Sequence, residues 1–192
     1  NKAYEFNGSS DFMVIPPLLK ADSLRSLTIS LWVKATNISR GTVIAFRLPG
    51  TMLCSSYMGF DNSGNGFNIH HQMIHNFSAN SCTSSMIKDT IANPQNTWVH
   101  MVLVQQYYTQ YSVGQYKYLQ YINGRQLLGS NTPLRTDAQK TSFASGGTIG
   151  ANNNSGNYQF NFTMFKGSID DIRIYERALT EDEIKKLYEI KE

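Results

Sequence analysis

The sequence predicts an all-β protein: a two-sheet antiparallel sandwich that ends in one short helix. Segments rich in Ile, Val, Tyr and Phe recur along the chain, and Gly and Asn turns separate them. Helical periodicity occurs only in residues 180–188. No repeat or linker divides the 192 residues, so we expect a single domain over residues 1–192. Because the chain begins abruptly at Asn1, we interpret it as a mature fragment or an excised domain of a larger protein.

The first half of the chain contains five predicted strands. Residues 3–6 and 11–15 lie on either side of a Gly-Ser-Ser turn, and residues 27–33 alternate apolar residues with Thr and Ser, as half-buried strands do. Strands at 42–46 and 66–71 follow, and we expect a long polar loop between them.

The second half begins with the most hydrophobic segment. Residues 97–104 are apolar at both parities, which predicts a central strand covered on both faces. Strands at 116–122 and 125–128 are joined through Asn123-Gly124, a strong hairpin sequence. A short strand at 148–150 then precedes an Asn- and Gly-rich loop.

The last predicted strand starts near Asn161 and changes parity. Phe165 and Ile169 are apolar at odd positions, whereas Ile172 and Ile174 are apolar at even positions. One strand cannot bury both sets on one face without an extra residue. We therefore predict a β-bulge near Asp170-Asp171. Because a bulge changes the direction of nearby side chains, a functional acid could lie there.

A short helix follows this strand. Thr180 and Glu183 have the spacing of a capping box, and Ile184, Leu187 and Tyr188 fall on one helical face. The sequence therefore predicts a helix that starts after Thr180 and packs through this apolar face.

Composition favours an extracellular binding protein over a nucleic-acid-binding or membrane protein. Charged residues make up 16% of the chain, and the net charge is +3 with no basic run. No apolar segment is long enough to span a bilayer. Cys54 and Cys82 lie in the polar middle region, and we favour a disulfide between them in an oxidising compartment; two reduced thiols are the alternative.

Six parts of the chain, in order, match the motifs of one family. The closing segment 165–179 follows the pattern F-x-G-x-I-D-D-V-R-I-Y-x-R-A-L most closely. The others are Phe6-Asn7-Gly8 with residues 11–15, residues 27–33, Trp98-Val99-His100-Met101-Val102, Tyr121-Ile122-Asn123-Gly124 and Thr148-Ile149-Gly150. Together they resemble the laminin-G-like group of the concanavalin A-like lectin/glucanase superfamily.

The resemblance implies a jelly-roll sandwich of the kind found as an accessory module on secreted and cell-surface proteins. Members of this group bind glycans or proteins, and many bind one Ca²⁺. Relative to the minimal family pattern, the segment between Phe46 and Trp98 is a long insertion that includes both cysteines.

The acids of this sequence do not suit a glycosidase. Glycosidases need two carboxyl groups about 5–9.5 Å apart on neighbouring positions. No Glu occurs between Glu5 and Glu176, and between Asp89 and Asp170 the only acid is Asp137. There is also no Gly-x-Ser-x-Gly elbow and no His-Glu-x-x-His or Cys-x-x-Cys zinc motif. We therefore predict that the protein is not an enzyme.

Calcium is the expected cofactor, in a structural role. Ca²⁺ takes 6–8 oxygen ligands from carboxylates, carbonyl groups and water. If the first and last strands pair, Asp11 and Asp170 come together as ligands, and the carbonyl groups of Asn7 and Gly8 complete the shell. The alternative is that Asp11 caps a turn and that Asp171 pairs with Arg173 or a lysine.

Exposed aromatic and amide side chains are the expected sugar contacts, because they combine ring faces with hydrogen-bonding groups. Tyr107, Tyr108 and Tyr111 are the main candidates, since we expect them in a loop. Further candidates are Tyr57, Phe60, His71, Asn153 with its neighbours Asn152 and Asn154, and Tyr158. The alternative is that most tyrosines only fill strand positions, which they favour.

The sequence thus predicts a non-catalytic, extracellular or cell-surface binding module that recognises a carbohydrate. The alternative is a structural or protein-interaction domain that packs against a neighbouring domain of its parent chain or binds a cell-surface protein. A glycan-active enzyme is disfavoured by the distribution of acids.

Overall fold

The computed structural model describes residues 2–17, 26–36, 40–47, 55–61, 67–78, 81–91, 95–110, 113–127, 146–152 and 164–190; for β6, β7 and several strand ends it describes the backbone alone. The elements are β1 (Tyr4–Asn7), β2 (Met13–Ile15), β3 (Leu27–Ala35), β4 (Arg40–Arg47), β5 (Ser55–Asp61), β6 (Phe67–Ser78), β7 (Ser81–Ile91), β8 (Val99–Gln110), β9 (Val113–Ile122), β10 (Arg125–Gln126), β11 (Gly147–Ile149), β12 (Lys166–Tyr175) and α1 (Glu181–Glu189).

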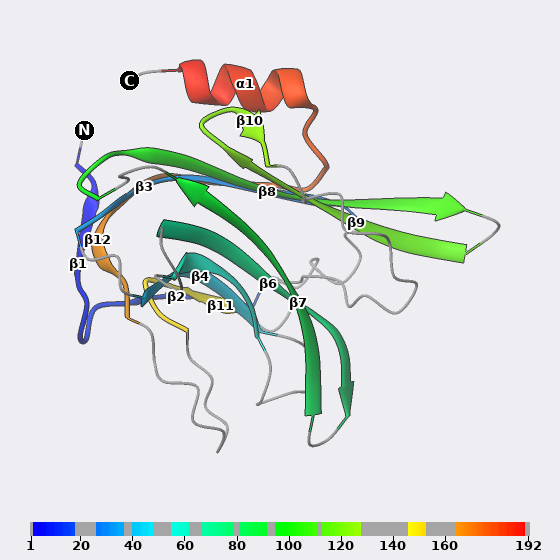
Figure 1. The fold of residues 1–192 in the computed structure, drawn as a ribbon, viewed down its shortest axis with the longest axis horizontal. Coiled ribbons are helices and arrows are strands. Elements are labelled where there is room, and N and C mark those ends of the chain that lie inside the picture. The colour runs from blue at the N-terminus through cyan, green and yellow to red at the C-terminus, as the bar shows by residue number, and fades with distance from the viewer. Residues whose placement is uncertain are drawn as a thin grey trace.

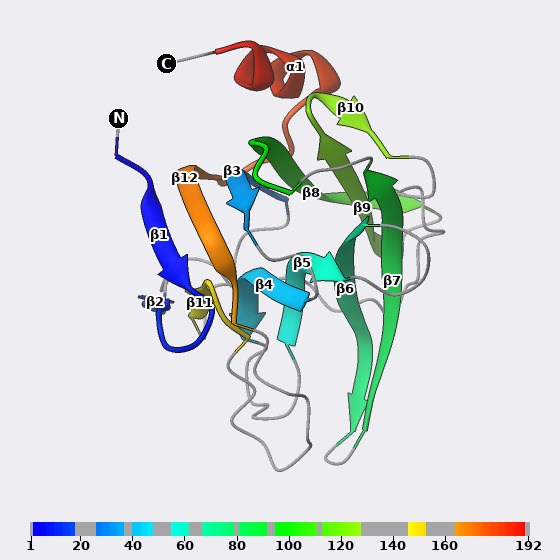
Figure 2. The ribbon, with the colours of Figure 1, turned by 60° about the vertical axis from the view of Figure 1, so that its left-hand side comes forward.

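These strands form two six-stranded sheets that pack face to face (Figure 1). Sheet A has the order β1-β12-β3-β8-β9-β10, and sheet B has the order β2-β11-β4-β5-β6-β7. Every strand pair is antiparallel, and the first strand, β1, pairs with the last, β12, as expected. Figure 2 shows α1 on the side of sheet A that faces away from sheet B. The predicted jelly-roll sandwich with a C-terminal helix is confirmed.

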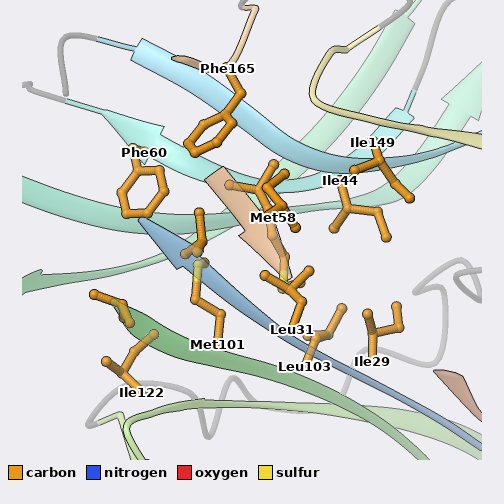
Figure 3. Close-up of a cluster of buried hydrophobic side chains, with 14 of the residues drawn as sticks. Ile29, Leu31, Ile44, Met58, Phe60, Met101, Leu103, Ile122, Ile149 and Phe165 are labelled. Atoms are coloured by element: carbon orange, nitrogen blue, oxygen red, sulfur yellow. The ribbon is translucent and has the colours of Figure 1, made fainter. Parts of the chain in front are cut away.

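The main core fills the space between the sheets. Ile29, Leu31 and Met101 from sheet A are fully buried against Ile44 and Met58 from sheet B (Figure 3). Because side chains alternate along a strand, residues 28, 30 and 32 of β3 face the other way. Thr28 and Ser30 are nevertheless buried, so β3 is covered on both faces rather than half-buried as its alternation predicts.

The prediction of a long polar loop between residues 46 and 66 is wrong. β5 fills part of it, and β6 continues beyond residue 71 to Ser78 and pairs with a further unpredicted strand, β7. β7 has the sequence SCTSSMIKDTI, which starts with polar residues and shows no clear alternation. It forms a strand because β6 offers an edge for pairing, and such pairing overrides weak local propensity.

Two local predictions are confirmed in detail. Asn123 and Gly124 both have positive φ angles, of 51° and 75°, as a two-residue type I′ hairpin between β9 and β10 requires. In β12 the register with β3 shifts between Asp170 and Arg173, and Asp171 has φ 48°. This is the predicted bulge. The strand itself begins at Lys166, later than the predicted start near Asn161, which lies outside the described residues.

Helix α1 starts where its capping box predicts. The Thr180 side chain accepts a hydrogen bond from the Glu183 backbone N–H, and the Glu183 carboxylate accepts one from the Thr180 backbone N–H. Arg177 also donates two hydrogen bonds to Glu183, at 2.6 and 2.9 Å. Ile184 is fully buried against Val102 and Val104 of β8, so the helix closes a second apolar cluster on the outer face of sheet A. No described helix is long and apolar enough to cross a membrane.

Candidate ligand-binding surface

Tyr107 and Tyr108 lie within strand β8, so the prediction of a loop at residues 107–111 is wrong for both. β8 continues to Gln110 because β9 pairs with it over its whole length, ending at Gln110 opposite Val113. Tyrosine favours strand positions, which is the physical reason for the error. Tyr111 lies outside the described residues.

The two tyrosines lie on opposite faces of the sheet. Tyr107 is opposite Tyr116, which packs against the main core and therefore lies on the inner face, toward sheet B. Tyr108 is opposite Gln115 and has the other parity, which is the parity of the residues under α1. Only Tyr107 can therefore belong to an inner-face site.

Four side chains form what we call the inner-face row: Gln105, Tyr107, Tyr116 and Tyr118. The Tyr107 and Tyr116 rings meet edge to face, with centroids 5.3 Å apart and planes at 61°, and both are half-buried. Behind them, the Tyr118 hydroxyl donates a hydrogen bond to Gln105 Oε1 at 3.1 Å. Figure 1 shows the β8–β9 hairpin projecting to the right while β6 and β7 bend downward, so the ends of these two hairpins point in different directions. The row brings aromatic rings, phenols and one amide together, which are the groups that bind sugars in proteins.

Sequence reasoning missed Gln105, Tyr116 and Tyr118 as site residues. Each is ordinary by itself, and they become neighbours only through the register of β8 with β9. The parity rule combined with this register would have found them, since residues 101, 103, 105 and 107 share a face and each pairs with one residue of β9.

Most other ligand candidates are not placed in this site. Phe60 is 1% exposed and stacks on Phe165 with centroids 6.1 Å apart, so its proposed role as a sugar contact is wrong. Tyr57 is in register with Gln72, whereas His71 is in register with the buried Met58, so these two positions belong to opposite faces of sheet B. Asn153, Asn154 and Tyr158 lie outside the described residues.

The proposed calcium ligands Asp11 and Asp170 are not brought together. Asn7 is in register with Lys166, and Asp170 lies four residues further along β12, about 13 Å away. Asp11 stays at the turn, where its Oδ2 accepts the Asn7 N–H at 3.0 Å. Two ligands of one Ca²⁺ lie within about 5 Å of each other. The prediction of a calcium site shared by Asp11 and Asp170 is therefore wrong.

The turn of residues 7–11 closes on itself. Asn7 Oδ1 accepts hydrogen bonds from the backbone N–H groups of Ser9 and Ser10, both at 2.8 Å, and the left-handed Gly8, with φ 77°, makes the bend. Asp11 thus caps a turn, the alternative considered for it. Among the described residues no group of three or more His, Cys, Asp or Glu side chains could hold a metal ion. Calcium binding remains a prediction that needs a different ligand set.

The bulge does not provide a pair of catalytic acids in a groove. Asp171 is exposed and accepts a hydrogen bond from Arg173 Nε at 2.6 Å, the pairing considered above for this acid. Asp170 accepts the N–H of Asp171 at 2.8 Å and is in register with Trp32. Both acids therefore belong to the outer side of sheet A, beside the helix.

A buried histidine lies on the same outer side. His100 Nε2 lies 2.8 Å from Ser30 Oγ, which confirms the prediction that His100 is a hydrogen-bonded core residue. Its ring is 5.1 Å from Trp32 and 6.1 Å from Tyr188 of α1, measured between centroids. Burial lowers the pKa of His100 to about 4, although the charge of Asp171 acts in the opposite direction. These three rings attach the end of α1 to the sheet.

The disulfide stays a prediction. Cys54 lies outside the described residues, and for Cys82 the structure gives only its place in β7, opposite Phe77.

Comparisons with known proteins agree with this architecture. The model of the concanavalin A-like lectin/glucanases superfamily matches residues 7–185. No curated protein matches the chain. Among solved structures, a heptameric SAP-like pentraxin from Limulus polyphemus is similar, with a TM-score of 0.57 and 16% identity over 96% of this chain and 80% of that one.

Two other similar structures are longer than this chain. A putative carbohydrate binding protein from Bacteroides ovatus has a TM-score of 0.58 and 17% identity over 95% of this chain and 45% of its own. The binding domain of botulinum neurotoxin DC in complex with SialylT has a TM-score of 0.59 and 15% identity over 97% and 42%. The chain therefore spans less than half the length of these two proteins, and at such identities the likeness shows the fold alone.

Proposed function

The chain belongs to the concanavalin A-like lectin/glucanases superfamily, and from this premise we propose that it is a non-catalytic module that binds a carbohydrate. The inner-face row of β8 and β9 is the observation that carries the proposal. The binding site is the half-buried ring pair Tyr107 and Tyr116, with Gln105 and Tyr118 behind it.

Two features of the row suit a sugar. Half-buried rings offer apolar area to the C–H groups of a pyranose without a large loss of side-chain entropy. Behind the rings, the buried Tyr118 hydroxyl and Gln105 amide are hydrogen-bonded to each other at 3.1 Å, and they provide a donor and an acceptor for sugar hydroxyls when this bond opens. Two similar structures, a putative carbohydrate binding protein and a botulinum neurotoxin binding domain in complex with SialylT, add support from related folds.

The proposed role is extracellular or at a cell surface, and without catalysis. The scarcity of acids along the central strands supports the second point, because bond cleavage requires a carboxyl pair. A Cys54–Cys82 bridge would accord with an oxidising compartment. Mass spectrometry after alkylation without reductant tests it, since a bridged protein gains no alkyl groups.

A glycan array with three proteins tests the function. We expect the wild-type chain to bind at least one printed glycan and Tyr107→Ala to bind it about tenfold more weakly, because the ring contact is lost. Tyr108→Ala is the matched control, since it removes the adjacent tyrosine on the other face of β8. Silence of the wild-type protein on the array, or equal loss in both variants, would contradict the proposal.

The second candidate function is a domain that packs against another protein surface. Tyr4, Phe12 and Val14 are three of the five large apolar side chains that are exposed among the described residues, and all lie at the N-terminal edge of the sandwich. β1 and β2 are edge strands of their sheets, which are surfaces that favour pairing. An array without signals, together with weaker association after Val14→Asp, would favour this function.

A further inference from the structure

Gln120 lies next to the inner-face row and has an unusual environment. It follows Tyr118 on the same face of β9 and is in register with Leu103, between the row and the apolar core. Its side chain is 0% exposed. Within the described part of the chain, neither the Nε2 nor the Oε1 atom of this amide has a hydrogen-bond partner.

A buried amide without partners is costly and therefore calls for an explanation. Most buried polar groups in proteins are hydrogen-bonded, and an unpaired group loses its hydration without compensation. An apolar residue of similar size would fit this position better, since Leu103 lies opposite and Ile122 follows on the same face. The amide thus lowers the stability of the free protein and calls for an explanation other than packing.

We propose that Gln120 determines which sugars the inner-face row accepts, by pairing with two adjacent hydroxyl groups of the ligand. This inference rests on the proposed function. One hydroxyl accepts from Nε2–H and its neighbour donates to Oε1, so a vicinal diol satisfies both atoms at once. Tyr116, Tyr118 and Gln120 lie at every second position of β9, and the first and last are about 13 Å apart. The row together with Gln120 is thus long enough for more than one sugar ring.

The route to Gln120 follows from the same geometry. Tyr118 is 2% exposed and Gln105 is 1% exposed, and both lie between Gln120 and the half-buried ring pair. A diol reaches the amide when these two side chains move aside, so we expect slow association, because binding then requires a conformational change. A site that hydrogen-bonds a hydroxyl pair discriminates strongly against ligands that lack one hydroxyl, since the amide is again left unpaired.

Replacing Gln120 tests the proposal through two readouts of opposite sign. Gln120→Leu should raise the melting temperature of the free protein by about 2–4 °C or more, because the unpaired amide is gone. The same variant should bind the glycans of the array about 10–100-fold more weakly, and only those that present two adjacent free hydroxyls. Gln120→Met serves as a second variant with an unbranched side chain, and Gln106→Leu makes the same change at an exposed position of β8.

Each outcome decides between the two claims. If wild-type protein binds glycans and Gln120→Leu binds them equally well, the role of Gln120 is wrong while the proposed function stands. Weaker binding with a lower melting temperature in both Gln120 variants would show that the amide is a structural partner, which also overturns the inference. If Gln120→Leu weakens binding equally for glycans with and without adjacent hydroxyls, Gln120 does not recognise a vicinal diol. Absence of any glycan binding by the wild-type protein would remove the proposed function itself.

Discussion

The two faces of the β8–β9 hairpin are made by alternating residues of the same strands, yet their chemistry differs sharply. On the outer face Val102, Val104 and Tyr121 are at most 3% exposed, covered by Ile184 of α1 and by Leu179, which precedes the helix. The inner face carries the three phenols and the amide of the inner-face row, with the Gln120 amide next to them. Outer-face side chains therefore serve stability, and we assign recognition to the inner face beyond the core. Because the period is two, a strand can separate these tasks residue by residue.

The largest expected effect is a loss of stability from a substitution that disrupts the packing of the outer face alone. Ile184→Ala removes a fully buried side chain and leaves a cavity between α1 and sheet A, so it should lower the free energy of unfolding by about 4 kcal/mol. Glycan affinity of the folded fraction should stay unchanged. Urea unfolding measures the first quantity and calorimetric titration the second.

Ile190→Ala is the control for this change, since Ile190 lies at the C-terminal cap of the same helix and is 47% exposed. It should alter stability by no more than about 0.5 kcal/mol. If both variants destabilise the protein equally, or if Ile184→Ala removes glycan binding, the two faces are not independent.

The second largest expected effect concerns His100, the buried histidine of the outer face, and the pH dependence of stability. The pKa of His100 is about 4 in the folded chain, below its usual value of 6.5, so on acidification the unfolded chain takes up this proton first. The stability that neutral His100 confers is complete above about pH 6.5 and is lost between pH 6.5 and about 4. The loss reaches about 3 kcal/mol at its limit.

A comparison of unfolding free energies at several pH values, for wild type and His100→Gln, isolates this contribution. The variant should lack this part of the slope between pH 6.5 and 4, because glutamine does not titrate. Parallel curves for the two proteins would mean that His100 titrates normally and that its burial between Trp32 and Tyr188 is not maintained in solution.

What the sequence predicted well is local. The capping box at Thr180, the type I′ turn at Asn123 and the bulge at Asp171 each depend on a few adjacent residues, and all three are present. β5 and β7 were missed because their own sequences lack strong alternation and they become strands through pairing with β6. The inner-face row was missed in part for the same reason: Tyr107 and Tyr116 meet only once β8 and β9 are in register. Features that depend on adjacent residues were thus predicted, and features that depend on pairing between distant strands were missed.

The smallest expected effect lies at the turn of residues 7–11, which belongs to neither face of the hairpin. If calcium binds at this turn, Asp11 should be its acid without Asp170, because Asp170 is too far along β12 to share the ion. One carboxylate makes a weak site, and at a Ca²⁺ concentration equal to its dissociation constant the gain in stability is only about 0.4 kcal/mol. We expect the melting temperature to rise slightly with Ca²⁺, to do so equally in Asp170→Ala, and not to do so in Asp11→Ala. A response lost in Asp170→Ala would contradict the register of β1 with β12, and a wild-type protein that melts identically with Ca²⁺ and with chelator would show that calcium has no structural role here.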